Sequence, residues 1–235
     1  MTNPDTHSRR TFLRHAALGS GGLLLPALGR AQPPGSQPGQ KDQEISPAED
    51  LMREHGVLSR ILLIYDEAAR RIEAAAESSL EPVTKAADLV RRFIQDYHEK
   101  LEENYLFPRF EKAGQLVDLV EVLRVQHQAG RRVTDEISKQ ITAVTKGPTE
   151  SRHLVAALRA FGRMYRPHKA REDTVLFPAL HTVFASREYD VLGDSFEDKE
   201  HELFGAEGFE KVVRDVAELE KALGLYDLGQ FTPLA

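Results

Sequence analysis

Two stretches of the sequence share a pattern of residue types that bind metals. The pattern is His-x-x-x-Glu followed shortly by Leu-Phe-Pro, and it occurs at 98–108 and again, 70 residues later, at 168–178. On a helix, residues four apart differ by about 40° around the axis and about 6 Å along it, so both side chains can reach one point. Each copy can therefore supply one imidazole and one carboxylate, from His98 with Glu102 and from His168 with Glu172.

A further histidine precedes each copy by a similar distance. His55 lies 43 residues before His98, and His127 lies 41 residues before His168. The repeated unit is thus one helix with a single His, followed by a second helix with His-x-x-x-Glu. Two such hairpins would aim four imidazoles and two carboxylates at the middle of a bundle. Nitrogen and carboxylate ligands without sulfur suit iron, manganese or zinc, and two equal ligand sets favour two metal ions bridged by carboxylates.

The elements that must position these residues are helices. Ser46 and Glu49 form a capping box with Pro at the first helical position, which predicts that a helix begins at Pro47. Hydrophobic periodicity, Pro and Gly then predict long helices over 47–76, 82–112, 116–146 and 150–182, and two shorter ones over 186–204 and 207–223. Short connections favour antiparallel neighbours. We predict an all-α fold: an up-down-up-down four-helix bundle with two additional C-terminal helices.

Composition limits the classes of function. The chain has 235 residues, 41% of them hydrophobic, and no Cys, which excludes disulfides and iron–sulfur clusters. Its formal charge of −6, with both signs interspersed, argues against nucleic acid as a partner. No apolar run is long enough for an integral membrane segment in the mature chain.

The N-terminus has the features of an export signal. The paired Arg9 and Arg10 precede an apolar, Gly-rich stretch and a small-residue site at Ala31. This order is typical of a bacterial twin-arginine signal, so we expect the twin-arginine translocase as a partner and a periplasmic or exported mature protein. The expected organisation is a signal peptide at 1–31, a flexible linker at 32–45, the bundle at 46–184 and a C-terminal helical extension at 185–235.

The histidines, the two His-x-x-x-Glu motifs and both Leu-Phe-Pro tripeptides resemble the hemerythrin-like HHE cation-binding domain over about residues 46–182. The resemblance implies a four-helix bundle with two non-haem, carboxylate-bridged iron ions that meet O2 or a related small ligand; manganese and zinc fit less well. Oxygen-carrying hemerythrins have two His four apart on the third helix. Here Leu123 and Arg131 stand four residues from His127, which argues against reversible O2 carriage.

Two assignments stay open at this point. Glu103 and Asp173 lie five residues after their His and are alternative carboxylates to Glu102 and Glu172. A fifth imidazole is the second question, because a fifth helix that folds back would return His201 to the level of the metals.

The function that follows is metal binding of the hemerythrin-like type, with binding of O2, reaction with O2 or iron handling in the periplasm. The alternative is a di-iron enzyme that acts on peroxide, nitric oxide or ferrous iron. The sequence leaves open whether the protein is a catalyst.

Overall fold

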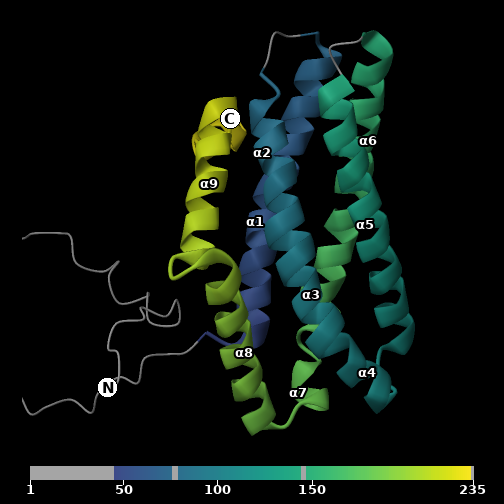
Figure 1. Ribbon diagram of the computed structural model, residues 1–235, viewed down its shortest axis with the longest axis vertical. Coiled ribbons are helices and arrows are strands. Elements are labelled where there is room, and N and C mark those ends of the chain that lie inside the picture. The colour runs from purple at the N-terminus through teal and green to yellow at the C-terminus, as the bar shows by residue number, and fades with distance from the viewer. Residues whose placement is uncertain (1–44, 76–78, 144–146, 234–235) are drawn as a thin grey trace, which may run out of the picture. The chain divides into compact units, whose positions relative to one another are not determined.

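A computed structural model describes residues 45–75, 79–143 and 147–233, and every regular element in these ranges is helical (Figure 1). The predicted all-α fold is therefore confirmed. Residues Ser46–Ala235 form one compact unit. The predicted signal peptide and its Arg9 and Arg10 lie outside the described residues. Among the described helices, none is both long and apolar enough to cross a membrane.

The first long helix, α1 (Pro47–Glu73), begins where its capping residues predict. The Ser46 hydroxyl accepts a hydrogen bond from the Glu49 backbone N–H at 3.2 Å, which satisfies one of the donors left open at a helix start. Buried residues recur along one stripe of α1, and this stripe carries His55 next to the wholly buried Leu51 and Leu58.

The second long helix is built from five consecutive segments. They are α2 (Glu81–Leu89), the π-helical η2 (Val90–His98), α3 (Glu99–Leu101), the π-helical η3 (Glu102–Leu106) and α4 (Phe107–Ala113). Gly114, with φ of 65°, ends it in a left-handed conformation that glycine adopts without strain.

The third and fourth long helices complete the bundle. They are α5 (Val117–Ala143) and α6 (Pro148–Arg171), which continues into the π-helical η5 (Glu172–Leu176). α1 packs against both α2 and α6, and α5 packs against both α6 and α2, so each long helix touches its neighbours along the chain. Figure 1 shows these helices side by side. The histidines at positions 55, 98, 127 and 168 are all buried.

Each Leu-Phe-Pro tripeptide begins at the last residue of a five-residue π-helical segment that starts at a candidate ligand. The Phe107 and Phe177 N–H groups donate to the carbonyls five residues back, at Glu102 and Glu172. A proline ring clashes with the carbonyl four residues before it and offers no N–H, and the wider π turn accommodates both effects. The helix continues past Pro108, but η5 ends before Pro178, and the short α7 (Leu180–Val183) follows a turn.

Two further helices, α8 (Ser186–Phe204) and α9 (Gly208–Leu223), pack against α1 and the second long helix; the 3₁₀ turn η6 (Leu228–Phe231) follows them. Phe204 lies edge-on to the rings of Phe93 and Tyr97, each at 5.5 Å between centroids. Arg60 on α1 pairs with the Glu220 carboxylate at 2.6 Å. Through these contacts, α8 and α9 form a second layer over α1 and the second long helix.

Candidate metal centre

The structure brings the six main candidate ligands together in two groups of three. Within each group the ligand atoms lie within 4.8 Å of one another, and all six residues are buried. The first group is His55, His98 and Glu102, and the second is His127, His168 and Glu172. Each group therefore has the two imidazoles and one carboxylate that one copy of the repeated unit supplies.

The two carboxylates lie between the groups. Glu172 Oε2 is 3.2 Å from Nε2 of His168 in its own copy and 3.4 Å from Nε2 of His55 in the other copy. Glu102 does the converse, with Oε1 3.7 Å from His98 Nε2 and Oε2 3.3 Å from His127 Nε2. A carboxylate with an imidazole of each group on either side is placed to bridge two metal ions.

Several polar atoms at this centre have no hydrogen-bond partner among the described residues. They are both carboxylate oxygens of Glu102, both of Glu172 and Nε2 of His127. Leaving such atoms buried and unpaired is costly, whereas a coordinated cation would satisfy them together. In addition, Nε2 of His55 lies 3.0 Å from Nε2 of His98, and two imidazole lone pairs this close need a proton or a cation between them. The residues present thus fit a dinuclear metal centre.

An outer layer of acceptors orients all four imidazoles. The pairs that join a ring Nδ1 to an oxygen are His55 with Asp173 at 2.6 Å, His98 with Glu54 at 2.7 Å, His127 with Glu103 at 3.1 Å and His168 with Gln126 at 2.9 Å. A carboxylate or amide oxygen only accepts, so each Nδ1 carries the hydrogen and each Nε2 is left to face the centre. This tautomer is the one that a metal-binding histidine needs.

This layer also shows where the alternative carboxylates lie. Glu103 and Asp173 occupy it, while Glu102 and Glu172 lie at the centre. Sequence reasoning missed two of its members, Glu54 and Gln126. Both directly precede the first histidine of a copy and both bind the second histidine of that copy, so their shared offset is a signal that the sequence did contain.

The structure does not bring His201 into either group. The inward stripe of α8 ends in Phe196 and Glu200, which are both buried, and the next residue is turned by about 100°. His201 is half-buried beside this stripe, and its carbonyl accepts the helix-ending hydrogen bond from Gly205.

The ionisable side chains of the metal-free centre have pKa values shifted in different directions. Burial alone would lower the pKa of His55, but its contacts with the carboxylates of Asp173 and Glu172 raise it to about 9. Burial lowers the pKa of His127 to about 4 in spite of its contact with Glu103. Burial, followed by the charge of Glu172, raises the pKa of Glu102 well above its usual value. His55 therefore holds a proton that a bound metal would displace.

One side of the centre carries an additional polar group. The Tyr165 hydroxyl donates to the buried Glu99 carboxylate at 2.6 Å, and Arg131 pairs with Glu99 at 2.8 Å and with Glu103 at 2.7 Å. Tyr165 fits here because Gly130 has no side chain: a Cβ there would lie 2.0 Å from the Tyr165 hydroxyl. Burial raises the pKa of Glu99 to about 8, although both partners oppose the shift.

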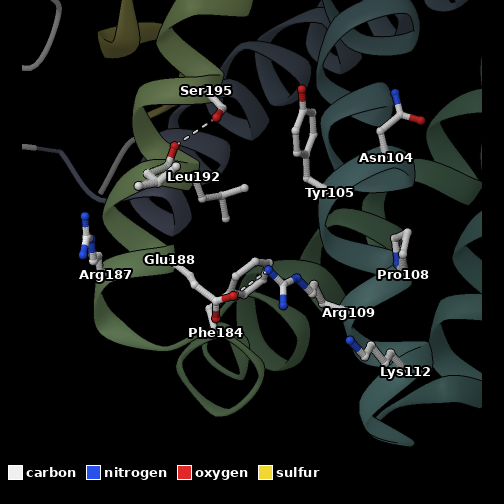
Figure 2. Close-up of a pocket in the computed structure, with 11 residues that line it drawn as sticks. Asn104, Tyr105, Pro108, Arg109, Lys112, Phe184, Arg187, Glu188, Leu192 and Ser195 are labelled. Carbon is white, nitrogen blue, oxygen red and sulfur yellow. Dashed lines mark hydrogen bonds and ion pairs between the residues drawn. The ribbon is translucent and has the colours of Figure 1, made fainter.

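A groove of about 680 Å³ lies next to the centre but is separate from it (Figure 2). Tyr105 and Arg109 line one wall, and Phe184 and Leu192 line the wall formed by α8 and the residues before it. None of the six central ligands lines it. Across the groove, Arg109 donates a hydrogen bond to Glu188 at 2.8 Å. The Arg109 guanidinium, one of the cations that line the groove, is therefore already paired.

Comparisons with known proteins agree with the site. The family profile described as "Hemerythrin HHE cation binding domain" matches residues 46–180, which contain both groups of ligands. Uncharacterized proteins of Mycobacterium bovis (strain AF2122/97) and Mycobacterium tuberculosis (strains CDC 1551 and H37Rv) are each 46% identical to the chain over 240 residues, covering 99% of this chain and 94% of theirs. No solved structure matches the chain at a significant level.

Proposed function

Because the chain belongs to the hemerythrin HHE cation-binding family, we propose that it holds two non-haem iron ions and uses them to react with O2 or to handle iron. The observation that carries this proposal is the position of Glu102 and Glu172, each between an imidazole of its own copy and one of the other copy. Four imidazoles and two carboxylates are a donor set that would suit iron, and manganese and zinc are the rivals to be tested.

The chain's own residues have three tasks at this centre. The imidazoles and carboxylates hold the ions, the outer acceptors fix the ring orientations, and apolar side chains exclude water. For the last task, the Phe177 ring stacks on His55 at 5.3 Å and the Phe107 ring stacks on His127 at 5.5 Å between centroids. When bound, an iron pair would supply the electrons that reduction of O2 or a related oxidant requires.

The residues four positions from His127 favour a reaction over reversible carriage. A fifth imidazole at either position would complete the ligand set of the oxygen carriers, but one is the apolar Leu123 and the other is Arg131, a permanent cation whose guanidinium is paired with two carboxylates. We therefore expect oxidation of the centre by air that removal of O2 does not reverse. A di-iron enzyme that acts on peroxide, nitric oxide or ferrous iron is the alternative that shares this expectation.

The proposed function also involves the direction of the four long helices and the cellular location of the protein. We propose that the four long helices alternate in direction, up-down-up-down, since successive helices pack against each other through short connections. We also propose that the twin-arginine signal at Arg9 and Arg10 exports the folded, metal-loaded protein to the periplasm.

Anaerobic purification with metal analysis tests the function. We expect about two iron atoms per chain, and an optical spectrum that changes once on exposure to air and does not revert when O2 is removed. A single tightly bound zinc ion in protein from iron-replete cells would refute the di-iron centre. A spectrum that reverts on deoxygenation would instead support O2 carriage.

A further inference from the structure

Arg131 holds one nitrogen atom between two carboxylates beside the metal centre. The same terminal guanidinium nitrogen lies 2.8 Å from Glu99 Oε2 and 2.7 Å from Glu103 Oε1. The Glu99 side chain is 1% exposed, that of Glu103 13% and that of Arg131 22%, so water screens this contact only weakly.

Those two carboxylates belong to a third group of potential metal ligands. Glu99, Glu103 and His127 offer ligand atoms within 4.8 Å of one another, the same limit that the two central groups meet. The Nδ1 hydrogen of His127 is donated to Glu103, so a cation in this group would be held by the carboxylate oxygens and water. Oxygen ligands of this kind suit a hard divalent cation such as Mn²⁺ or Fe²⁺. In this protein the Arg131 guanidinium lies between the two carboxylates, and the Lys100 ammonium lies 2.6 Å from Glu103 Oε2 on the outer side.

The two halves of the bundle differ at these positions in a correlated way. In the second copy, Lys169 stands at the position equivalent to Glu99, directly after the helix's histidine. In the first copy, Ser59 stands at the position equivalent to Arg131, four residues after the histidine, and its hydroxyl donates to the His55 carbonyl at 2.7 Å. The extra carboxylate and the arginine thus occur together on one side of the centre, and neither occurs at the matching position.

We propose that Arg131 occupies a latent third cation site with its guanidinium and so limits the centre to two metal ions. Arg131 is a positioning residue in this proposal, because it contacts Glu99 and Glu103 and none of the six central ligands. The proposal extends the dinuclear centre proposed above, but it predicts a difference between two proteins and therefore has its own test.

Equilibrium dialysis of metal-free protein against Mn²⁺ measures the number of ions bound. We expect about two ions for the native chain and about three for Arg131→Gln, which keeps a polar side chain but removes the charge. Arg131→Ser, which copies Ser59, is a second variant in case Arg131→Gln does not accumulate. The matched control is Arg132→Gln, which removes an exposed charge from the next residue of α5 and should still bind about two ions.

Two more variants separate loss of charge from loss of structure. Arg131→Lys keeps a cation near the carboxylates and should bind as the native chain does. Glu99→Gln combined with Arg131→Gln removes a carboxylate together with the cation and should return the count to that of the native chain. Without metal, Arg131→Gln should unfold at a lower temperature than the double variant, because it removes the cation that Glu99 and Glu103 share. Mn²⁺ should then raise its unfolding temperature more than that of the native chain.

An Arg131→Gln protein that binds the same number of ions as the native chain would overturn the proposal. So would a double variant that binds one ion more than the native chain. If the native chain bound fewer than two ions, the proposed dinuclear function would fail, and the difference of one ion between Arg131→Gln and the native chain would still decide the role of Arg131.

Discussion

Asp173 Oδ1 lies 2.6 Å from Nδ1 of His55, although the two residues belong to different copies of the repeated unit. The reciprocal pair is Glu103 with His127, at 3.1 Å. Each copy therefore orients a histidine of the other copy, and each central carboxylate faces histidines of both. Each ligand group takes its three ligands from one hairpin but has one histidine oriented by the other hairpin, which ties metal binding to folding of the whole bundle.

Removing the acceptor at position 173 should weaken metal binding without removing a ligand. Outer acceptors hold ring orientation and basicity, and their loss costs about 10- to 100-fold in metal affinity. We expect this loss for Asp173→Ala, measured by competition with a chelator of known affinity. Asp173→Asn should retain most of the affinity, because an amide oxygen can accept the same hydrogen bond, as Gln126 does for His168.

The control for that prediction is Asp118→Asn, at an exposed position on α5. It changes the net charge by the same amount as Asp173→Asn and should leave metal affinity unchanged. Equal affinity of Asp173→Ala and the native chain would show that the contact with His55 does not orient the ring in the holo protein.

The repeat of histidines was sufficient to predict the ligand groups, because i,i+4 geometry on a helix is local and follows from the sequence alone. The start of α1 was equally local, as Ser46 caps its own helix. The roles of Glu102 and Glu103 were harder to separate. Neighbouring residues on a helix differ by about 100° in direction, and which of them faces the centre depends on how the helices are rotated against each other.

The two Leu-Phe-Pro tripeptides show the same limit. Both begin at the last residue of a π-helical segment, yet the helix continues past Pro108 and stops before Pro178. The same tripeptide has two outcomes, so the tripeptide alone does not decide whether the helix continues. The third ligand group was also hidden, because it joins Glu99 and Glu103 to His127 on another helix.

Replacing His201 tests the hypothesis of a fifth imidazole. Given its half-buried position beside the inward stripe of α8, we expect His201→Ala to keep the iron content and the optical spectrum of the native protein. His168→Ala is the comparison, and it should lose iron because it removes a central ligand. A drop in iron content for His201→Ala similar to that for His168→Ala would restore His201 to the ligand set.

Export is tested at the paired arginines. We expect the double substitution Arg9→Lys and Arg10→Lys to leave the precursor in the cytoplasm, because a twin-arginine signal is read through these residues. Cell fractionation with detection of the uncleaved and cleaved forms measures the outcome. A control that replaces Arg14 with Lys lies outside the pair and should be processed normally. Processing of the double variant at the native rate would exclude this route.

The raised pKa values of the metal-free centre predict that metal binding releases protons. Contacts with the carboxylates of Asp173 and Glu172 outweigh burial and raise the pKa of His55 to about 9, so this imidazole is protonated at pH 7. Burial and the charge of Glu172 also raise the pKa of Glu102 well above its usual value. A metal ion binds only the unprotonated nitrogen and the ionised carboxylate, so loading at pH 7 should release at least the proton of His55.

Metal affinity should rise as the pH increases from 6.5 toward 8.5 and should fall on acidification, because protons compete with the metal for the same atoms. Calorimetric titration of metal-free protein with Mn²⁺, in buffers of different ionisation enthalpy, counts the protons directly. Glu102→Gln should still release the His55 proton but should lose affinity, because it removes a central ligand. Binding that released no protons at pH 7 would show that His55 is neutral in the metal-free chain, and its contact with Asp173 would then act through orientation of the ring alone.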